Sequence, residues 1–535
     1  MGGVTAPDDL RTIADRYRYE VGELVATSRA MSSERDIRTL LAMILEKCRQ
    51  VTGADAGSVY VLEGEGPAPQ KRLHFMLSQN DSIAINFKES TLGVDEKSIV
   101  GKAVLDARPI NIPDLEHLGD PGQNPWGFQH NKSFDEKTGY RARSMLTVPM
   151  LSAESVVIGV VQLINRKRNP SARLLGPDDF TREVVEFDDW SEELALALAS
   201  QAGISLENAI LYDEIKRLFE GFVDASVTAI ESRDPTTSGH SRRVATLSVA
   251  LAEKVDAAGD GVFKDVHFTR AGYKKIEYAG MLHDFGKVGV REKVLVKAKK
   301  LYEEDRHALE MRFAYIRRGI EGELCERKLR LALELGRDGV AGRFAELDAE
   351  AARRIAGLDD AWSFIAKANE PTLLEEGGFE RLIEIAQLQY LSPTGELLPY
   401  LETGEVAALQ IARGSLTAVE RVEIESHVVH TYNFLKKIPW QRDMADLPRI
   451  AGAHHEYLNG IGYPRRLSGG DIPIESRMMT IADIYDALTA SDRPYKKAVP
   501  IDRALGIIEG EVKAGKCDAD LFRVFVESEV YKKVL

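Results

Sequence analysis

The chain has 535 residues, of which 44% are hydrophobic and 29% charged, and its formal net charge is −14. This length exceeds what one hydrophobic core can organise, so three or four units of about 150 residues are expected. An acidic chain is poorly suited to binding nucleic acid or an anionic membrane over a wide surface, although a local basic pocket could still hold phosphate.

Cysteine usage and hydropathy favour a cytoplasmic protein. Cys48, Cys325 and Cys517 lie far apart and form no CxxC motif, so neither a disulfide framework nor a cysteine zinc site is expected. The N-terminus lacks an apolar signal core, and no run reaches the roughly 18 apolar residues that span a bilayer. We therefore expect no membrane insertion.

The first 210 residues change from a helical to a strand pattern. Apolar residues recur at helical spacing between residues 8 and 50, which predicts an N-terminal helix over 1–30 and a second helix after the polar break SSERD. GADAGSVYVLE, residues 72–77, SMLTVPML and SVVIGVVQLINR are typical of strands. A short polar turn separates the last two and predicts a central antiparallel hairpin.

Residues 31–210 resemble a GAF domain. GSVYVLE, SIVGKAVLDARPINIPDL, DEKTGYRARSMLTVPM, GVVQLINRKRN and LALASQAGISLENA occur in GAF order, which implies an α+β domain with an antiparallel sheet and packed helices. The third segment looks like that of GAF domains in cyclic-nucleotide phosphodiesterases and cyclases. Their Asn-Lys…Phe…Asp-Glu motif has its nearest match, with Arg for Lys and Ser for Asp, in Asn165, Arg166, Phe187, Ser191 and Glu192. A cyclic-nucleotide pocket and a purely dimerising domain are both open.

A long helix over residues 191–232 is expected to leave this domain. Heptad-like steps of 7, 4, 3 and 4 separate Ile204, Leu211, Ile215, Leu218 and Phe222. Such steps form the seam of a coiled coil; the alternative is an amphipathic helix packed on its own domain. Because the helix joins a sensor-like domain to a candidate enzyme, we expect a parallel homodimer.

A second region begins at IESRDPTTSGHSRRV, where a proline ends the helix and a polar turn delivers His240 into a new helix. In AGMLHDFGK, His283 and Asp284 are adjacent among apolar residues. Adjacent helical residues point about 100° apart, so the pair could face two metal ions with the carboxylate as a bridge. The alternative is a hydrogen-bonded pair in the core, because a buried aspartate needs a cation or donors.

Residues from about 300 to 415 separate this pair from the next suitable histidine. They are rich in Glu, Arg, Leu and Ala in helical patterns and contain no histidine or cysteine cluster and no glycine-rich phosphate loop. We expect a helical insertion, which is either a solvated hairpin or a lid or partner surface near the site.

The expected pattern resumes after the insertion. Ser415 or Thr417 is placed to cap a helix with Glu420 in its first turn. This helix carries His427, which we choose as a ligand, and His430, which we expect to be a supporting or packed histidine.

The last segment supplies the remaining candidates. His454 and His455 are adjacent, and the glycines and proline after them predict a tight loop that can place Tyr463 over a substrate. On the helix MMTIADIYDALTA, Asp483 and Asp486 share a face. Either could bind metal; we assign Asp483 to the metal and Asp486 to the substrate, and a helix-facing hydrogen bond is the alternative for Asp486.

These groups suit one dinuclear centre of five imidazoles and two carboxylates, made by His240, His283, Asp284, His427, His454, His455 and Asp483. Imidazole and carboxylate ligands favour iron, manganese or zinc over calcium.

GHSRRV, HDFGK, the His427 helix, HHEYLNGIGYP and ADIYDALTASDRPYK together resemble the HD-GYP family of cyclic di-GMP phosphodiesterases. The resemblance implies an all-α domain over 233–535, interrupted by the insertion, in which those seven residues bind two divalent ions, most plausibly iron or manganese. It also implies that Lys287 acts with Asp284 in catalysis by neutralising a phosphate oxygen or the leaving group. Guanine or phosphate would be held by Tyr463, Arg493 and Lys496.

Two positions depart from the family pattern. Asn459 stands where Asp is usual, and Thr236 stands where some members have a Glu that binds a third metal, so two ions are expected. The implied reaction is attack of hydroxide on a phosphodiester of cyclic di-GMP, giving pGpG and then GMP. The alternatives are another cyclic dinucleotide such as cyclic GMP-AMP, another nucleotide phosphohydrolase, or a receptor that binds cyclic dinucleotide without cleaving it.

Overall fold

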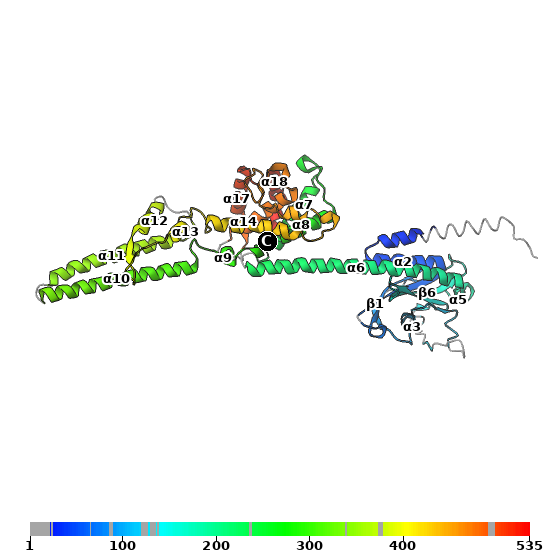
Figure 1. Cartoon of the computed structure of the whole chain (residues 1–535). Helices are drawn as coiled ribbons and strands as arrows, with labels where there is room; N and C mark the ends of the chain where they lie inside the picture. Colours follow the sequence, from blue (N-terminus) through cyan, green and yellow to red (C-terminus); the bar gives the residue numbers. More distant parts are fainter. Residues whose placement is uncertain are drawn as a thin grey trace, which may run out of the picture. The chain divides into compact units, whose positions relative to one another are not determined.

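The chain forms two compact units, Met1–Phe219 and Glu220–Leu535, whose helices and strands are labelled in Figure 1. The computed structural model describes residues 22, 25–64, 66–84, 89–118, 127–128, 135, 138–234, 238–336, 340–372, 378–490 and 498–534. Statements below refer to these residues.

The first unit is built on an antiparallel sheet with the strand order β3-β2-β1-β6-β5-β4, and β7 pairs with β6. The strands are β1 (Ala54–Glu63), β2 (Arg72–Asn80), β3 (Ser90–Gly93), β4 (Ile110–Ile112), β5 (Met145–Leu151), β6 (Val157–Lys167) and β7 (Val184–Val185). The predicted hairpin is confirmed, because β5 and β6 pair antiparallel with Val148 opposite Val161.

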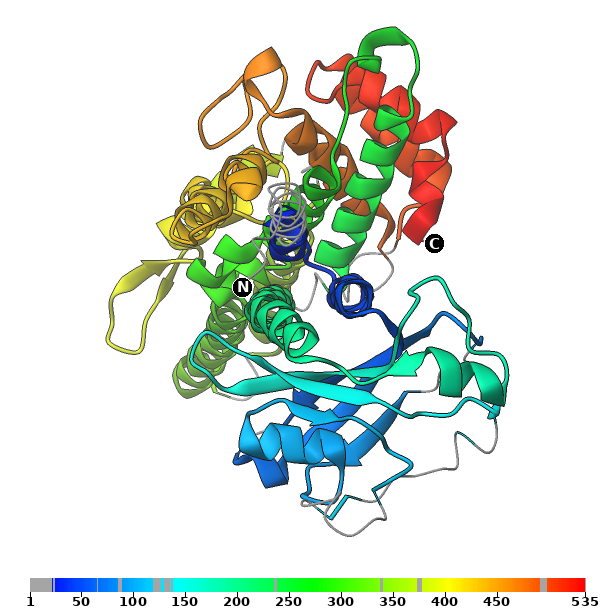
Figure 2. The same ribbon diagram turned by 90° about the vertical axis from the view of Figure 1, so that its right-hand side faces the viewer.

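Helices cover both faces of this sheet, as Figure 2 shows with α2 and α6 seen end-on. Side chains alternate along β1: Val59 and Val61 join the core under α2 and α6, whereas Tyr60 joins the core under α3. The helices are α2 (Ile37–Thr52), α3 (Ile99–Asp106), α5 (Pro177–Glu183) and the first part of α6 (Asp189–Arg233). This α+β architecture is the predicted one.

α6 is one continuous helix of 45 residues. Its heptad residues are exposed, most of all Ile215 at 60% and Leu218 at 75%, whereas Val223 and Val227 are buried in the second unit. By length and composition α6 is the one described helix that could cross a membrane, and half of its most apolar window is buried within the protein.

The second unit is helical around the candidate site. Its elements there are α7 (His240–Asp256), α8 (Arg270–Leu282), η4 (Phe285–Gly289), α9 (Glu292–Leu295), α14 (Ala418–Leu435), α15 (Leu447–Ala451), α16 (Ile474–Thr489), α17 (Ile501–Lys513) and α18 (Ala519–Glu527). One core joins α7, α8, α16, α17 and α18 through Leu247, Ile276, Ile481, Ile508 and Phe525.

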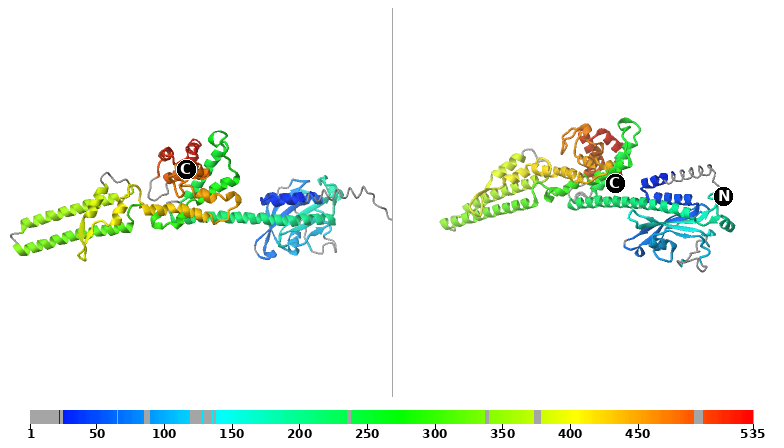
Figure 3. Two further views of the ribbon diagram at one scale, coloured as in Figure 1. Left: turned by 45° about the horizontal axis from the view of Figure 1, so that its top comes forward. Right: turned by 45° about the vertical axis from the view of Figure 1, so that its right-hand side comes forward.

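The insertion has a core of its own, to which Leu309, Phe313, Leu358 and Ile365 belong. Figure 3 shows its two long helices side by side in both views. Its elements are α10 (Glu303–Leu335), α11 (Ala341–Ala368), α12 (Gly378–Gln387), β8 (Gln389–Leu391), β9 (Leu397–Pro399) and α13 (Thr403–Leu409). The purely helical expectation was wrong in one detail, because β8 and β9 form an antiparallel hairpin.

The two ends of the insertion meet beside the N-terminus of α14. Ser415 donates a hydrogen bond to the carbonyl of Lys297 at 2.8 Å. Thr417 caps α14 in a capping box with Glu420, as the sequence predicted. The Glu420 carboxylate also accepts hydrogen bonds from Lys297 Nζ, at 2.7 and 2.8 Å, and from the Tyr302 hydroxyl.

Candidate metal centre

Seven imidazoles and carboxylates from five parts of the second unit converge. Two groups have ligand atoms that all lie within 4.8 Å of one another: the first is His240, His283 and Asp284, and the second is His427, His454 and His455. The seventh residue, Asp483 of α16, links the groups, because its carboxylate lies 3.2 Å from His240 Nε2 and 3.9 Å from His455 Nδ1.

Three of the histidines are held in one tautomer. Nδ1 of His283 donates to the carbonyl of Gly280 at 2.7 Å, Nδ1 of His427 to that of Ile424 at 2.5 Å, and Nδ1 of His454 to that of Ala451 at 2.6 Å. A carbonyl only accepts, so in a neutral ring the lone pair must be on Nε2. All three Nε2 atoms are buried without a hydrogen-bond partner among the described residues.

Burial keeps the second group neutral. It lowers the pKa of His427 and, with the neighbouring His455, lowers that of His454 well below its usual range. It also lowers the pKa of His455 to about 4. Near pH 7 these rings therefore present lone pairs rather than protons.

The first helical turn of α7 places His240 between two carboxylates. Its Nδ1 lies 2.7 Å from Asp486 Oδ2, and its Nε2 faces Asp483. Burial alone would lower the pKa of His240, but the hydrogen bonds to Asp483 and Asp486 raise it to about 9. Both oxygens of Asp486 are occupied, because Arg243 donates to them at 2.6 and 3.1 Å.

Asp486 therefore holds His240 and is not open to a substrate, being only 1% exposed. This placement differs from the substrate contact that we expected from the sequence and matches the alternative, a hydrogen bond within the packing of the helix.

Asp284 lies at the centre of the cluster. Its carboxylate is 3.4 Å from His283 Nε2, 3.3 Å from His427 Nε2 and 2.9 Å from Lys287 Nζ. Burial alone would raise the pKa of Asp284, but the charges of Lys287 and His283 hold it well below its usual range. Lys287 is itself held by Asp234, at 3.3 Å. An ionised, nearly inaccessible carboxylate among imidazoles is a suitable group to bridge two cations.

A close approach of two backbones fixes His283 and Asp284 against α14. A Cβ on Gly286 would lie 1.8 Å from the carbonyl oxygen of His427, so only glycine fits there. Thr431 of α14 joins the two backbones at this point: its hydroxyl donates to the carbonyl of His283 at 2.9 Å and accepts from Gly286 N at 2.8 Å. No pattern in the sequence points to Thr431.

The loop after the paired histidines folds back over them. A Cβ on Gly462 would lie 2.6 Å from the carbonyl oxygen of His455, and the ring of Tyr463 lies 4.8 Å from that of His455. Buried Glu456 accepts hydrogen bonds from Arg465 N and Leu467 N, at 2.7 and 2.9 Å. Tyr463 thus partly covers a candidate ligand.

Arg493, Lys496 and Thr236 are outside the described residues. His430 is exposed beside Gly289 and belongs to neither ligand group, so its expected supporting or packed role was wrong.

The seven residues fit a pair of divalent ions. The three buried Nε2 atoms have no hydrogen-bond partner among the described residues, and a buried acceptor left in this way costs free energy unless a cation binds it. Their Nδ1–carbonyl bonds are the outer contacts that commonly orient metal-bound imidazoles. Imidazole and carboxylate donors suit first-row transition metals.

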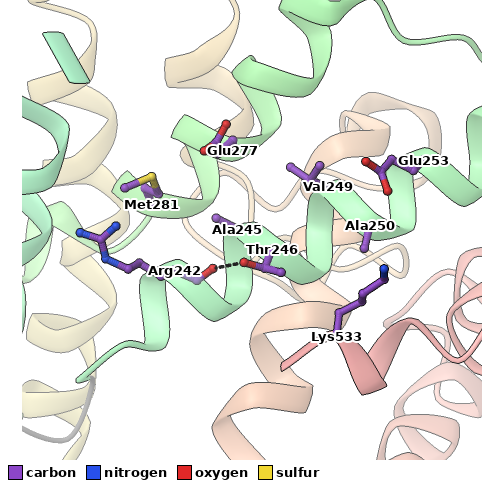
Figure 4. Close-up of a pocket in the computed structure, with 9 residues that line it drawn as sticks. All are labelled: Arg242, Ala245, Thr246, Val249, Ala250, Glu253, Glu277, Met281 and Lys533. Carbon is purple, nitrogen blue, oxygen red and sulfur yellow. Dashed lines mark hydrogen bonds between the residues drawn. The ribbon is translucent and has the colours of Figure 1, made fainter. Parts of the chain in front are cut away.

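A surface groove of about 490 Å³ lies on the outer side of α7 (Figure 4). Arg242, Thr246, Val249 and Glu253 line it, and at 100° per residue this face points away from His240. The groove combines two basic and two acidic side chains, Arg242, Lys533, Glu253 and Glu277. It is therefore separate from the histidine cluster.

The motif-like residues of the first unit serve its packing. Asn165 is fully buried, and its side chain donates to the carbonyl of Arg141 and accepts from Arg143 N, both at 2.7 Å. Arg166 pairs with Asp188 at 2.7 Å. Phe187 is buried, Ser191 donates to Asp188 at 2.6 Å, and Glu192 accepts from Asn111 at 3.0 Å.

Two family models match the chain. Residues 36–206 match the GAF domain and residues 394–521 match the HD domain. The second match begins within the insertion, so it contains His427, His454, His455 and Asp483 but not the first ligand group.

Relatives match over short stretches. The 3'3'-cGAMP-specific phosphodiesterase 3 of Vibrio cholerae serotype O1 is 45% identical over 96 residues, which are 18% of this chain and 20% of that protein. The 3'3'-cGAMP-specific phosphodiesterase 1 of the same organism is 35% identical over 115 residues, which are 22% of this chain and 26% of that protein. The cyclic di-GMP phosphodiesterase response regulator RpfG of Xanthomonas campestris pv. campestris is 48% identical over 59 residues, which are 11% of this chain and 15% of that protein. The matches thus span about a quarter or less of these relatives.

Solved structures are similar over about a third of the chain. The GAF domain from Acinetobacter phosphoenolpyruvate-protein phosphotransferase has a TM-score of 0.26 and 14% identity, covering 36% of this chain and 95% of that chain. The GAF domain/HD domain protein from Geobacter sulfurreducens has a TM-score of 0.23 and 15% identity, covering 34% of this chain and 98% of that chain.

Proposed function

We propose that this chain, which carries a GAF domain followed by an HD domain of the HD-GYP type, is a metal-dependent phosphodiesterase that hydrolyses a cyclic dinucleotide. The observation that carries the proposal is a set of buried Nε2 atoms without a hydrogen-bond partner among the described residues. Those of His283 and His427 lie 3.4 and 3.3 Å from the ionised carboxylate of Asp284, and His454 belongs to the same ligand group as His427. A purely structural cluster would satisfy these nitrogens with protein donors.

The seven residues predicted from the sequence would hold two divalent ions. Bound there, the ions would supply Lewis-acid chemistry by neutralising phosphoryl oxygens and lowering the pKa of water. Lys287 lies beside Asp284, and the charges of Asp284 and Asp234 raise its pKa although burial alone would lower it. It therefore stays cationic and can stabilise negative charge on a phosphoryl oxygen or the leaving group.

Substrate preference among cyclic dinucleotides is a finer proposal. The names of the relatives include both 3'3'-cGAMP and cyclic di-GMP phosphodiesterases. We take cyclic di-GMP as the first candidate, with pGpG and then GMP as products, and cyclic GMP-AMP as the second. Tyr463, with its ring on His455, is proposed to contact the bound nucleotide, and Arg493 and Lys496 are proposed to assist it.

The remaining parts would regulate this activity. We propose that α6 pairs with a second copy in parallel, because its heptad residues are exposed, and that the GAF domain senses a small ligand, with a cyclic nucleotide as the candidate. A cytoplasmic location fits a substrate of this kind.

A substrate panel tests the proposal. Protein purified without oxygen and loaded with iron or manganese is incubated with cyclic di-GMP, 3'3'-cGAMP, cyclic di-AMP and cyclic GMP, and products are identified by mass spectrometry. Linear dinucleotide from at least one cyclic dinucleotide is expected. Stable binding of a cyclic dinucleotide without any product, in both metals, would support a non-catalytic receptor instead.

A further inference from the structure

α10 of the insertion has two unlike faces. Leu309, Phe313, Ile316 and Ile320 are buried in the core that α10 shares with α11 (Figure 3). The opposite face carries exposed apolar side chains: the exposed fraction is 56% at Met311, 38% at Tyr315, 62% at Leu329 and 79% at Leu333. The ring of Tyr315 also contacts that of Tyr390 in β8, with centroids 6.0 Å apart. Four large apolar side chains on one exposed helix face mark an interaction surface rather than scattered surface residues.

These residues form a straight stripe centred on a glycine. At 100° per residue, positions 311, 315, 329 and 333 all fall within about 20° of the line through Gly322. A Cβ on Gly322 would meet nothing within 4 Å, so the middle of the stripe is open and another helix backbone can approach it closely.

The stripe is symmetric about Gly322. Met311 and Leu333 stand eleven residues before and after it, Tyr315 and Leu329 seven, and Arg318 and Glu326 four. The last two carry opposite charges and have highly exposed side chains, at 83% and 72%. Their pairs within α10, Arg318 with Glu321 and Glu326 with Arg330, are exposed and contribute little to stability.

We propose that α10 packs antiparallel against α10 of a second copy of this chain, about a twofold axis at Gly322. In such a pair Met311 of one copy lies level with Leu333 of the other, Tyr315 with Leu329, and Arg318 with Glu326. A twofold contact of this kind is self-complementary and closes after two copies.

A parallel pairing of the two α10 helices in register would be unfavourable for the charged residues of this face. It would place Arg318 beside Arg318 and Glu326 beside Glu326, and like charges across a helix pair oppose association. The charge pattern therefore selects the antiparallel arrangement. The contact lies wholly in the insertion and does not depend on the proposed function, since no candidate ligand is in α10.

Disulfide trapping in the full chain tests this contact, because the mass of the oligomer alone would not separate it from pairing through α6. The exposed Cys325 is first replaced, Cys325→Ser. Gly322→Cys in this background places the thiol at the twofold axis, and mild oxidation is expected to give a cross-link whose peptide joins residue 322 to residue 322. Circular dichroism checks that the variant is folded.

Leu333→Cys in the same background is the matched control. It lies on the same stripe, but in an antiparallel pair the two copies of residue 333 are about 33 Å apart along the axis, at 1.5 Å per residue. We expect no cross-link there. Cross-linking at 333, with or without cross-linking at 322, would show a parallel pair, because in register every residue then faces its own copy. Cross-linking at neither would show that this face does not pair; either result overturns the proposal.

A charge exchange tests the pairing of Arg318 with Glu326. In the Gly322→Cys chain, Arg318→Glu is expected to reduce the cross-linked fraction several-fold, and Arg318→Glu combined with Glu326→Arg is expected to restore it. If the double variant cross-links no better than the single one, the antiparallel register is wrong.

Discussion

The Nδ1 atom of His240 lies 2.7 Å from the Oδ2 atom of Asp486, and this contact turns the opposite ring nitrogen toward Asp483 and Asp284. Because Arg243 occupies the rest of the Asp486 carboxylate, the orientation of a candidate ligand depends on a residue that binds neither metal nor substrate.

Asp486→Asn should therefore weaken metal binding without unfolding the protein. Loss of such an outer contact commonly lowers metal affinity about 10- to 100-fold. Without the negative charge, the pKa of His240 in metal-free protein should fall below its present value of about 9. Metal titration and NMR titration of His240 would measure the two effects. Asp520→Asn, which removes an exposed carboxylate paired with Arg523, is the control; equal affinity in both variants would refute the role of Asp486.

Gly286→Ala should damage the site through the backbone. The added Cβ would meet the carbonyl oxygen of His427 at 1.8 Å, so η4 and α14 must separate, at a cost of about 3 kcal/mol or more in the free energy of unfolding. Chemical denaturation and metal content would both report this change.

Gly289→Ala in the same short helix is the matched control for Gly286→Ala. The atoms nearest to its Cβ would belong to the exposed ring of His430, at 2.5 Å, and this ring can turn away. If both variants are as stable as the parent protein, the close approach of Gly286 to the backbone of α14 is not required for stability.

The anchor of the insertion should be sensitive to acid. Burial alone would raise the pKa of Glu420, but hydrogen bonds from Lys297, Tyr302 and the Thr417 backbone lower it to about 2. A folded-state pKa below the unfolded value stabilises the protein above the unfolded value of 4.5, and this stabilisation is lost as the pH falls from 4.5 toward 2. Glu420→Gln should thus cost about 2–3 kcal/mol at pH 7 and progressively less below pH 4.5.

Denaturation at pH 7, 5 and 3.5 would measure this dependence. Glu303→Gln, at an exposed position of α10, should show a much smaller effect throughout. A cost at Glu420 that does not change with pH would contradict the ionic role of its carboxylate.

The insertion should be removable without loss of metal. Its ends meet where Ser415 contacts Lys297, so a short Gly-Ser linker can replace residues 300–413. None of the seven ligand candidates lies in that segment. The metal content of the shortened chain should equal that of the full chain when both are measured on folded monodisperse protein; a loss of half or more would show that the insertion helps to build the site.

The sequence predicted most of the cluster because its ligands come in local pairs. His283–Asp284 and His454–His455 are adjacent in the chain. Each pair follows the end of a helix, α8 at Leu282 and α15 at Ala451, so the expectation that His283 and Asp284 lie within a helix was wrong. The β5–β6 hairpin of the first unit could also be predicted from the sequence, because strand length and a short polar turn determine it.

Contacts between distant elements could not be read in this way. The spacing of Asp483 and Asp486 places both on one face of α16, but only the packing of α7 shows that His240 lies between them. Thr431 is inconspicuous in the sequence because its importance comes from the backbone of η4. The β8–β9 hairpin did have a local signal, since Ser-Pro-Thr-Gly at 392–395 is a turn sequence between two short apolar runs.

Metal analysis of Asp284→Ala, together with its hydrolysis of cyclic dinucleotide, tests the central claim most directly. Asp284 contacts both ligand groups, so its loss should reduce bound iron or manganese from about two ions per chain to a small fraction and should abolish hydrolysis. Asp305→Ala, an exposed position of α10, should leave both unchanged. An Asp284→Ala chain that keeps its full metal content and full activity would contradict the account.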